Sequence, residues 1–576
     1  MHPRFLRPLA ALAISAVSLG APLRAAAPDA GQVLRDQPQL PEENHPAAPL
    51  IPEPAAAPPA AAAAGVVVEV KGFRFTGHAE LAAESELQAA VAGWVGRSIA
   101  AAELPSVTTA VTALLRRKGF LLARAYFPPQ DITAGTVEIA IVQAKADGSV
   151  GIRRSGGARM AEERLQAFAT NSVAPGQPLR EQDLERALLL INDLPGVVGR
   201  LLLEQGAAPG TTRVSLDVSE SALLSGSVWA DNFGSRYTGA LRGNGVVFLN
   251  DPTGRGDQLS VLLSGAENMR QGRATYSVPL GASGLKGNVS GSLLAYEIGK
   301  EFADLDLQGR VRTLNGWFTY PLVLRRDSGM TGSLGYEYKA LADQAAGVDT
   351  RDRRLASGSL GLSGFFRDSL GGGGYSAGSV TATAGGVGLS RIPADQAQDR
   401  AGPRVGGSFA RLNLSFSRHQ QLPGGFSFLV AYFGQRASGN LSSSEKFTLG
   451  GPYGVRAYPI GEASGDEGHQ FNFELRRDLR LGHRGGSLEL VGFFDTGSIH
   501  LNKDRWTGDV SSATRKNSYQ LSGAGVGLNY GWRNRLSLRL SYAWRIGANP
   551  GRSPDGYNAD GRDAPGCFWV TGQVRL

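Results

Sequence analysis

From about residue 221 to residue 576, apolar and polar residues alternate in segments of about ten residues, separated by Gly, Asn, Asp and Ser. In SLELVGFFDTGS (487–498), Leu488, Leu490 and Phe494 fall on one face, and Asp495 falls on the other. Successive side chains of a β-strand point to opposite faces, so the pattern predicts strands with one apolar and one polar face. A transmembrane β-barrel needs such strands, because lipid covers its outside, water fills its lumen, and closure pairs every backbone group.

Glycine content divides the chain into two parts. The first 220 residues hold 18 of the 78 glycines, which leaves 60 in the last 356. About 22 residues per strand and connection give roughly 16 strands over residues 221–576, an even number as bacterial barrels require. The alternative is a soluble β-sandwich or lectin-like domain that buries the apolar faces in a core. The low charge on the apolar faces and the predicted N-terminal signal peptide, described below, favour the barrel.

The part before residue 221 is predicted to form two small α+β modules in tandem, at residues 66–144 and 145–220. In the first module, VVVEVKGFRFTG (66–77) is strand-like, LPSVTTAVTALLRRKGF (104–120) carries one apolar helical face, and two strands follow. The second module repeats this order of a strand, two helices and two strands. The fold class is therefore α+β modules followed by an all-β transmembrane barrel of about 16 antiparallel strands.

Two segments precede the modules. Residues 1–27 place Arg4 and Arg7 before a short apolar run, which is typical of a secretory signal peptide. The alternative, a transmembrane anchor, needs a longer run of about 20 apolar residues. Residues 28–65 begin with DAGQVLRDQ, a predicted short helix with Asp29 as its N-cap, and continue as a Pro/Ala-rich extended linker.

Charge and chemistry give few further candidates. The net charge of +8 is spread along the chain without a basic block, which argues against a nucleic-acid partner. The one cysteine, Cys567, excludes an intrachain disulfide. The seven histidines have no metal-ligand spacing, and no nucleophile motif or phosphate-binding loop is present. We therefore expect no enzymatic activity, no cofactor and no metal site.

Arg456 lies in a long glycine-rich segment, residues 438–468, between two predicted strands. A connection of this length is commonly functional. If it folds into the barrel lumen, Arg456 enters a confined, partly desolvated space and needs acidic or carbonyl partners. Asp495 is a candidate, since alternation places it on the inward face and a carboxylate matches the guanidinium fork. The alternative, an exposed loop cation, stays open on spacing alone.

These motifs together resemble the outer-membrane transporters of two-partner secretion (TpsB proteins, the ShlB/FhaC/HecB haemolysin secretion/activation family), a branch of the Omp85 superfamily. In that family two periplasmic POTRA modules precede a 16-stranded barrel, and a loop with a Val-Arg-Gly-Tyr motif folds into the lumen. A second motif, aromatic-x-Asp-x-Gly, lies on a barrel strand, and the resemblance implies that its aspartate pairs with the arginine. The matching residues here are Val455, Arg456, Ala457 and Tyr458, with alanine replacing the glycine, and Phe493, Asp495 and Gly497.

The resemblance covers nearly the whole chain after the signal peptide. FPPQDITAGTVEIAIV (127–142) is similar to the end of the family's first POTRA module, and DNFGSRYTG (231–239) is similar to the start of its barrel. DAGQVLRDQ (29–37) resembles the N-terminal helix that plugs the pore in some members. One departure is Leu576 at the C-terminus, where such barrels usually end on phenylalanine.

The resemblance implies a pore that recognises an unfolded exoprotein, a TpsA-like adhesin or haemolysin, through its POTRA modules and translocates it to the surface. The implied location is the outer membrane of a Gram-negative bacterium, with the POTRA modules in the periplasm. Outer-membrane lipid and the barrel assembly machinery are further expected partners. Candidate substrate-binding residues on the first module are Arg124, Tyr126, Phe127, Gln130, Val137 and Ile139. The alternatives are an Omp85-type assembly factor and, less favoured, a passive diffusion porin.

Overall fold

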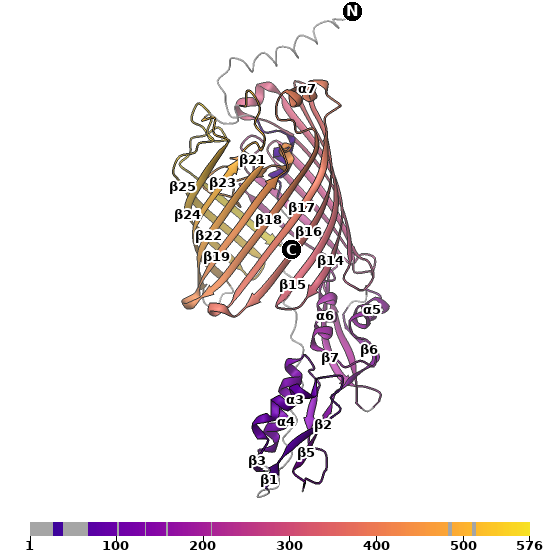
Figure 1. The fold of residues 1–576 in the computed structure, drawn as a ribbon. Helices are drawn as coiled ribbons and strands as arrows, with labels where there is room; N and C mark the ends of the chain where they lie inside the picture. The colour runs from indigo at the N-terminus through magenta and orange to yellow at the C-terminus, as the bar shows by residue number, and fades with distance from the viewer. Residues whose placement is uncertain are drawn as a thin grey trace, which may run out of the picture.

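The computed structural model describes residues 27–38, 67–100, 103–132, 134–156, 159–208, 210–481, 486–509 and 514–576. The predicted signal peptide and most of the Pro/Ala-rich linker lie outside these residues. Within them, no helix combines the length and the hydropathy that a bilayer span needs. Two α+β modules extend from one end of a closed barrel (Figure 1).

The first module is built on a three-stranded sheet in the order β2-β5-β4. Strands β2 (Gly72–Thr76) and β5 (Thr136–Val142) are parallel, and β4 (Arg124–Tyr126) is antiparallel to β5. The module also contains α3 (Glu84–Val91), η2 (Ala92–Trp94) and α4 (Leu104–Arg117), and a separate pair formed by β1 (Val67–Val70) and β3 (Arg97–Ala100). The apolar face of α4 packs on this sheet through Val107, Val111 and Leu115, which are fully buried.

The second module has the same plan and touches the barrel. Its sheet order is β6-β8-β7, from β6 (Lys145–Ser155), β7 (Val197–Gln205) and β8 (Thr211–Glu220), and it is covered by α5 (Glu162–Ser172) and α6 (Glu181–Asn192). Barrel turns dock on this module: the backbone N–H of Arg326 donates to Glu185 Oε1 at 2.9 Å. Leu324 packs against the module's core.

The barrel is a closed, antiparallel sheet of sixteen strands, which confirms the predicted fold class. Its last strand pairs with its first over five residues, from Thr571 opposite Asp231 to Arg575 opposite Ser227. The strands are β9 (Leu224–Asp231), β10 (Arg242–Asn250), β11 (Gln258–Ala266), β12 (Met269–Pro279), β13 (Lys286–Glu297), β14 (Leu307–Leu324), β15 (Ser328–Ala345), β16 (Val348–Asp368), β17 (Gly374–Gly388), β18 (Gly407–Leu422), β19 (Phe426–Ala437), β22 (Glu467–Leu481), β23 (Gly486–His500), β24 (Ser518–Trp532), β25 (Leu536–Ile546) and β26 (Gly566–Arg575).

The two faces of each strand differ as the alternation predicts. On β23, Leu490 and Phe494 are exposed on the outside, while Val491, Phe493 and Asp495 are buried on the inside. The outward side chains face lipid, and the inward ones meet the segments that fill the lumen. Short elements lie between the long strands: η3 (Lys300–Leu305), η4 (Leu370–Gly372), α7 (Pro393–Ala401), η5 (Pro423–Gly425), η6 (Ser443–Glu445), β20 (Phe447–Thr448) and β21 (Ser464–Gly465).

Candidate functional site

The loop between β19 and β22, residues 438–466, folds into the barrel and forms a compact tip. The N–H of Val455 donates to the carbonyl of Leu449 at 2.7 Å, and the N–H of Tyr458 donates to the carbonyl of Val455 at 3.1 Å. Gly454 lies so close to Leu449 that a Cβ there would overlap the Leu449 carbonyl oxygen. The tip therefore depends on a glycine at this position, and it holds Arg456 at a fixed place.

Arg456 points at the wall formed by β22 and β23. Its Nε donates to Asp495 Oδ2 at 2.8 Å and its Nη2 to Asp495 Oδ1 at 2.7 Å, so the fork engages both carboxylate oxygens. Its backbone N–H also donates to Asp495 Oδ2, at 3.1 Å. The remaining Nη1 donates to Glu474 Oε1 at 2.7 Å. Two carboxylates thus neutralise one guanidinium in a site where the Asp495 side chain is fully buried.

Three more side chains of the wall complete the seat of Arg456. The guanidinium carbon lies 3.5 Å from the centre of the Phe493 ring, a cation–π contact. Asn472 donates to Asp495 Oδ1 at 2.7 Å and to the carbonyl of Gly454 at 2.9 Å. Trp569 on β26 donates its indole N–H to the Arg456 carbonyl at 2.8 Å. The loop tip is therefore tied to three separate strands of the barrel.

Ala457, which replaces the family's glycine, fits because a glycine lies opposite it. A Cβ added at Gly523 on β24 would overlap the Cβ of Ala457, which is itself almost fully buried. Gly497 leaves similar room, since a Cβ there would lie 2.5 Å from Leu449 Cδ2. Tyr458 is buried within the apolar cluster of the loop and wall. The extra methyl group of the motif is accommodated by the wall.

The base of the loop carries three buried carboxylates. Glu445 is paired with Lys339 at 2.8 Å and with Arg411 at 3.1 Å, and the pKa of Glu445 is lowered because these cations outweigh its burial. Asp466 is paired with Lys446 at 2.9 Å. Glu462 accepts from Asn549 Nδ2 at 2.8 Å and from the N–H of Ala559 at 2.6 Å, both in the loop between β25 and β26. Burial raises the pKa of the Glu462 carboxyl, and among the described residues no cation forms an ion pair with it.

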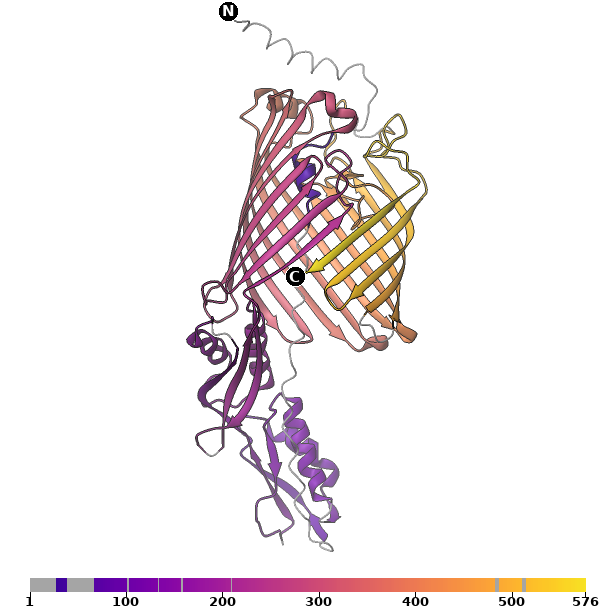
Figure 2. The same cartoon turned by 180° about the vertical axis from the view of Figure 1, so that it is seen from behind.

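The helix α2 (Ala30–Arg35) lies inside the barrel beside this loop (Figure 2). Asp29 caps its N-terminus by accepting from Gln32 N at 3.0 Å, and it pairs with Arg351 on β16 at 3.1 Å. The N–H of Ala30 donates to Asp343 Oδ1 at 3.0 Å. Ala30 and Val33 join an apolar cluster with lumen-facing residues of the barrel. The helix therefore occupies part of the lumen and is anchored to its wall.

The C-terminal end of α2 is held by the loop itself. Arg35 donates to the carbonyl of Lys446 at 2.7 Å, to Thr448 Oγ1 at 2.8 Å and to Ser464 Oγ at 3.0 Å. A Cβ on Gly31 would lie 2.5 Å from the backbone nitrogen of Ser444, so the helix approaches the loop closely. The two segments that obstruct the lumen are thus in direct contact.

The candidate residues of the first module fall into two groups. The side chains of Val137 and Ile139 are buried in the core, and β5, which carries them, is the central strand of its sheet. Both side chains are therefore covered in the folded module, and a contact of either with substrate stays a prediction. Gln130 bonds the backbone N–H of Glu138 at 2.6 Å and its carbonyl at 2.7 Å, and therefore has a structural role.

The other candidates lie at an edge. β4 pairs with β5 on one side only, so its second edge forms no ladder with the described strands. Arg124 and Tyr126 on this strand have exposed side chains, and Tyr126 is 47 % exposed. Phe127, which follows, packs partly against the core. An edge strand is a place where an extended chain adds, and on β4 the N–H of Ala125 already donates to Thr112 Oγ1 at 3.1 Å.

Sequence reasoning missed three residues that hold Arg456. Glu474 and Asn472 lie on inward positions of β22, so alternation in HQFNFELRRDL could have indicated them. Trp569 also alternates to the inside of its strand, but nothing in the sequence indicates that its indole reaches residue 456. Gly523 carries no sequence signal either, because its role depends on the residue opposite.

The chain matches two family profiles. The profile of the haemolysin secretion/activation protein ShlB/FhaC/HecB matches residues 210–530, more than half of the chain. The profile of the ShlB-type POTRA domain matches residues 68–144, the first module.

Characterised proteins and solved structures match over most of the length. The heme/hemopexin transporter protein HuxB of Haemophilus influenzae is 26% identical over 551 residues, covering 93% of this chain and 96% of HuxB. The outer membrane transporter CdiB of Escherichia coli is 25% identical over 438 residues, covering 73% of this chain and 71% of CdiB. The structure of CdiB from Escherichia coli superposes with a TM-score of 0.69 at 21% identity, covering 90% of this chain and 93% of CdiB, which shows a shared fold.

Proposed function

The chain belongs to the ShlB/FhaC/HecB family of haemolysin secretion/activation proteins, and from this premise we propose how it moves its substrate. It is an outer-membrane transporter of two-partner secretion that translocates an exoprotein, with its POTRA modules in the periplasm. An unfolded exoprotein binds the modules, enters the lumen from the periplasm, and leaves at the surface. The observation that carries this route is a closed barrel whose lumen holds two anchored, separable segments, α2 and the loop 438–466.

Recognition begins at the outer edge of β4. An extended segment of the exoprotein adds there as a further strand, since backbone bonding needs no particular side chains. The exposed ring of Tyr126 offers an apolar contact beside that edge. The substrate is one large secreted protein, an adhesin, a haemolysin or, by analogy with the name of HuxB, a protein concerned with haem.

Passage requires α2 to leave the lumen and the loop to move. Both are held by polar contacts and by apolar clusters with the wall, which an entering chain has to replace. The route uses no nucleotide, and folding of the exoprotein outside the cell supplies the driving force.

Two further partners follow from the barrel. Lipid covers outward side chains such as Leu293 and Leu360, which are 64% and 65% exposed. The barrel assembly machinery inserts the chain and engages β26, which ends at Arg575.

The test is secretion in cells. The gene is deleted, the proteins lost from the medium are identified, and the strain is complemented with wild type, Arg456→Ala and Arg436→Ala. Arg436 is a matched control, since its side chain is 62% exposed and it bonds Glu467 at 3.1 Å, away from the seat of Arg456. We expect one large exoprotein to vanish, Arg436→Ala to restore it, and Arg456→Ala to restore it poorly at equal barrel abundance.

Two outcomes contradict the proposal. If secretion is unchanged while other outer-membrane barrels decline, the protein is an assembly factor of the Omp85 type. If the barrel without residues 28–219 conducts steadily and no secreted protein depends on the gene, it is a diffusion porin.

A further inference from the structure

Two neighbouring strands carry an uncharged lane along the lumen. Leu355 on β16 and Val387 on β17 pack in the cluster that holds α2, so odd-numbered residues of both strands face inward. The pairing of β16 with β17 is unbroken from Arg354 opposite Gly388 to Asp368 opposite Gly374. From Leu355 to Phe365 the inward residues between them are serines and a glycine, and from Tyr375 to Val387 they are Ala, Ser, Thr and Gly. We call this surface the hydroxyl lane.

Several other parts of the lumen wall are charged. β22 presents Glu474 and Arg476 inward, which pair with each other at 2.6 Å, and β25 presents Arg539. β15 and β18 contribute Lys339 and Arg411, but only at the extracellular half, where both meet Glu445. β13 and β14 also present uncharged inward residues, among them Ser290, Ser292 and Thr313. What distinguishes the hydroxyl lane is the aromatic recess at its periplasmic end.

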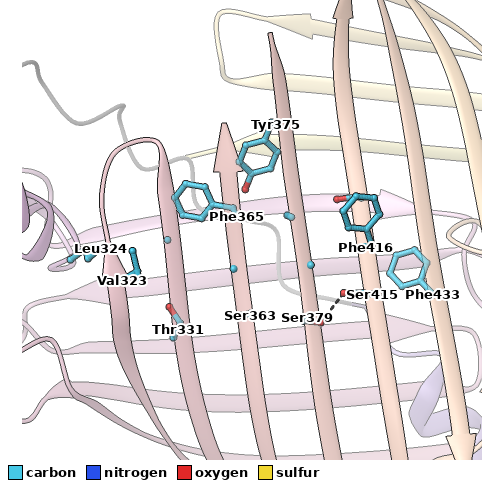
Figure 3. A pocket seen from close by; sticks show the side chains of 15 residues that line it. Val323, Leu324, Thr331, Ser363, Phe365, Tyr375, Ser379, Ser415, Phe416 and Phe433 are labelled. Atoms are coloured by element: carbon cyan, nitrogen blue, oxygen red, sulfur yellow. Dashed lines mark hydrogen bonds between the residues drawn. The ribbon is translucent and has the colours of Figure 1, made fainter. Parts of the chain in front are cut away.

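The periplasmic end of the lane opens into an aromatic recess (Figure 3) with a volume of about 310 Å³. Phe365 stacks on Tyr375 with 5.8 Å between ring centres. The guanidinium of Arg367 lies 5.5 Å from the centre of the same Tyr375 ring, so the uncharged part of the wall ends at this recess. Ser379 and Ser415 share a hydroxyl bond at 2.7 Å beside them. Phe433 and Tyr375 are 41% and 39% exposed, although the inside of a barrel is ordinarily polar.

The lane joins two regions already described. Leu324 lines the recess and also packs against the core of the second module, so the recess begins where that module docks. At the other end, Leu355 and Val387 form part of the seat of α2. A chain that comes from the modules and displaces α2 meets this strip along its whole path.

We propose that the hydroxyl lane and its aromatic recess are the surface on which the extended exoprotein slides. This inference rests on the proposed function and adds the part of the wall that carries the substrate. Serine and threonine hydroxyls both donate and accept, so they bond successive backbone N–H and carbonyl groups regardless of sequence. The exposed rings hold apolar side chains at the entry. Transport needs binding at many sites that are each weak, and a fixed charge would retain oppositely charged stretches of the substrate.

The test places a charge in the lane. Ser363 on β16 is changed to Asp, Lys or Asn, and Ser537 on β25, an inward residue of another wall, is changed to Asp. The readout is the secretion rate of the exoprotein that disappears in the deletion strain, normalised to folded barrel. We expect Ser363→Asp and Ser363→Lys each to slow secretion about fivefold, which corresponds to about 1 kcal/mol of added retention. Ser363→Asn and Ser537→Asp leave the rate within about twofold, since neither puts a charge in the lane.

A second measurement detects contact directly. A photoreactive benzoylphenylalanine is introduced at the position of Ser363 or of Ser537, and the exoprotein is stalled by fusion to a disulfide-closed domain. Crosslinks at Ser363 and none at Ser537 support the lane. Equal crosslinks at both, or equal slowing by Asp at both, overturn it. If no exoprotein is lost in the deletion strain, the proposed function itself has failed, which is a separate outcome.

Discussion

Replacing Arg456 by alanine tests the seat of the lumen loop most directly. The change removes both bonds to Asp495, one bond to Glu474 and the contact with Phe493. Glu474 keeps Arg476 as a partner, whereas Asp495, which is fully buried, loses the one ion pair that it forms with the described residues. Leaving one buried charge of an ion pair unpaired costs about 3–5 kcal/mol. Asn472 still donates to Asp495, so we expect the lower value, about 3 kcal/mol.

This free energy is lost from the seated loop, not from the whole barrel, because the strand ladder is unaffected. We expect the open population of the loop to rise roughly a hundredfold, since about 1.4 kcal/mol is a factor of ten. The assay is limited proteolysis of loop 438–466 in purified protein under conditions where cleavage is slower than reclosing, so that the rate follows the open population. The shift in gel mobility on heating measures the folded barrel as a control.

A double-mutant cycle separates this pair from its surroundings. Asp495→Asn removes the charge that Arg456→Ala leaves unpaired, so the double variant is less destabilised than the sum, by about 2 kcal/mol. Additive effects, or a loop cut at the wild-type rate in Arg456→Ala, would refute the reasoning and make Arg456 an ordinary loop cation.

The remaining predictions concern the wall, the base of the loop and α2. Gly523→Ala drives a methyl group into Ala457 and unseats the loop, and adding Ala457→Gly restores part of its protection from protease; no rescue would contradict the packing described. The raised pKa of Glu462 means that the closed loop favours the protonated acid. Protection from hydrogen exchange at residues 460–463 is therefore greatest below the ordinary glutamate pKa. It falls as pH rises through the raised pKa, and Glu462→Gln removes this dependence. Arg35→Ala deletes three hydrogen bonds between α2 and the loop. We expect the open probability of the pore in bilayer conductance recordings to rise about tenfold. An unchanged closed fraction would contradict the anchoring role of Arg35.

The barrel could be predicted from the sequence because lipid and water act on each residue separately. Alternation such as that of Leu490, Val491 and Phe494 places each side chain on a face, and the length then gives the strand number. The same reasoning placed Asp495 inside. Alternation did not predict where each residue lies along the barrel axis, because the stagger between strands depends on their pairing, which alternation does not encode. Contacts that depend on this axial position, such as that of Trp569 with Arg456, were therefore not predicted.

The first module shows the same limit in another form. Val137 and Ile139 alternate with Glu138, which already indicates that both apolar side chains face a core. Whether β5 is central or an edge depends on which strands pair with it, and the parallel pairing with β2 joins segments about sixty residues apart. The edge at β4 could therefore be identified only from the folded sheet.

The grip of Arg35 on the lumen loop has a consequence for the cell's permeability barrier. Because α2 and the loop 438–466 each supply part of the other's binding site, loss of one weakens the binding of the second. Pores with only one of the two segments in place are therefore rarer than they would be if the segments bound independently. Between secretion events such cooperativity keeps leakage of small toxic solutes low. It also sets a threshold: we expect a ligand that disturbs both segments to open the pore more readily than one that disturbs a single segment, such as an unrelated periplasmic peptide.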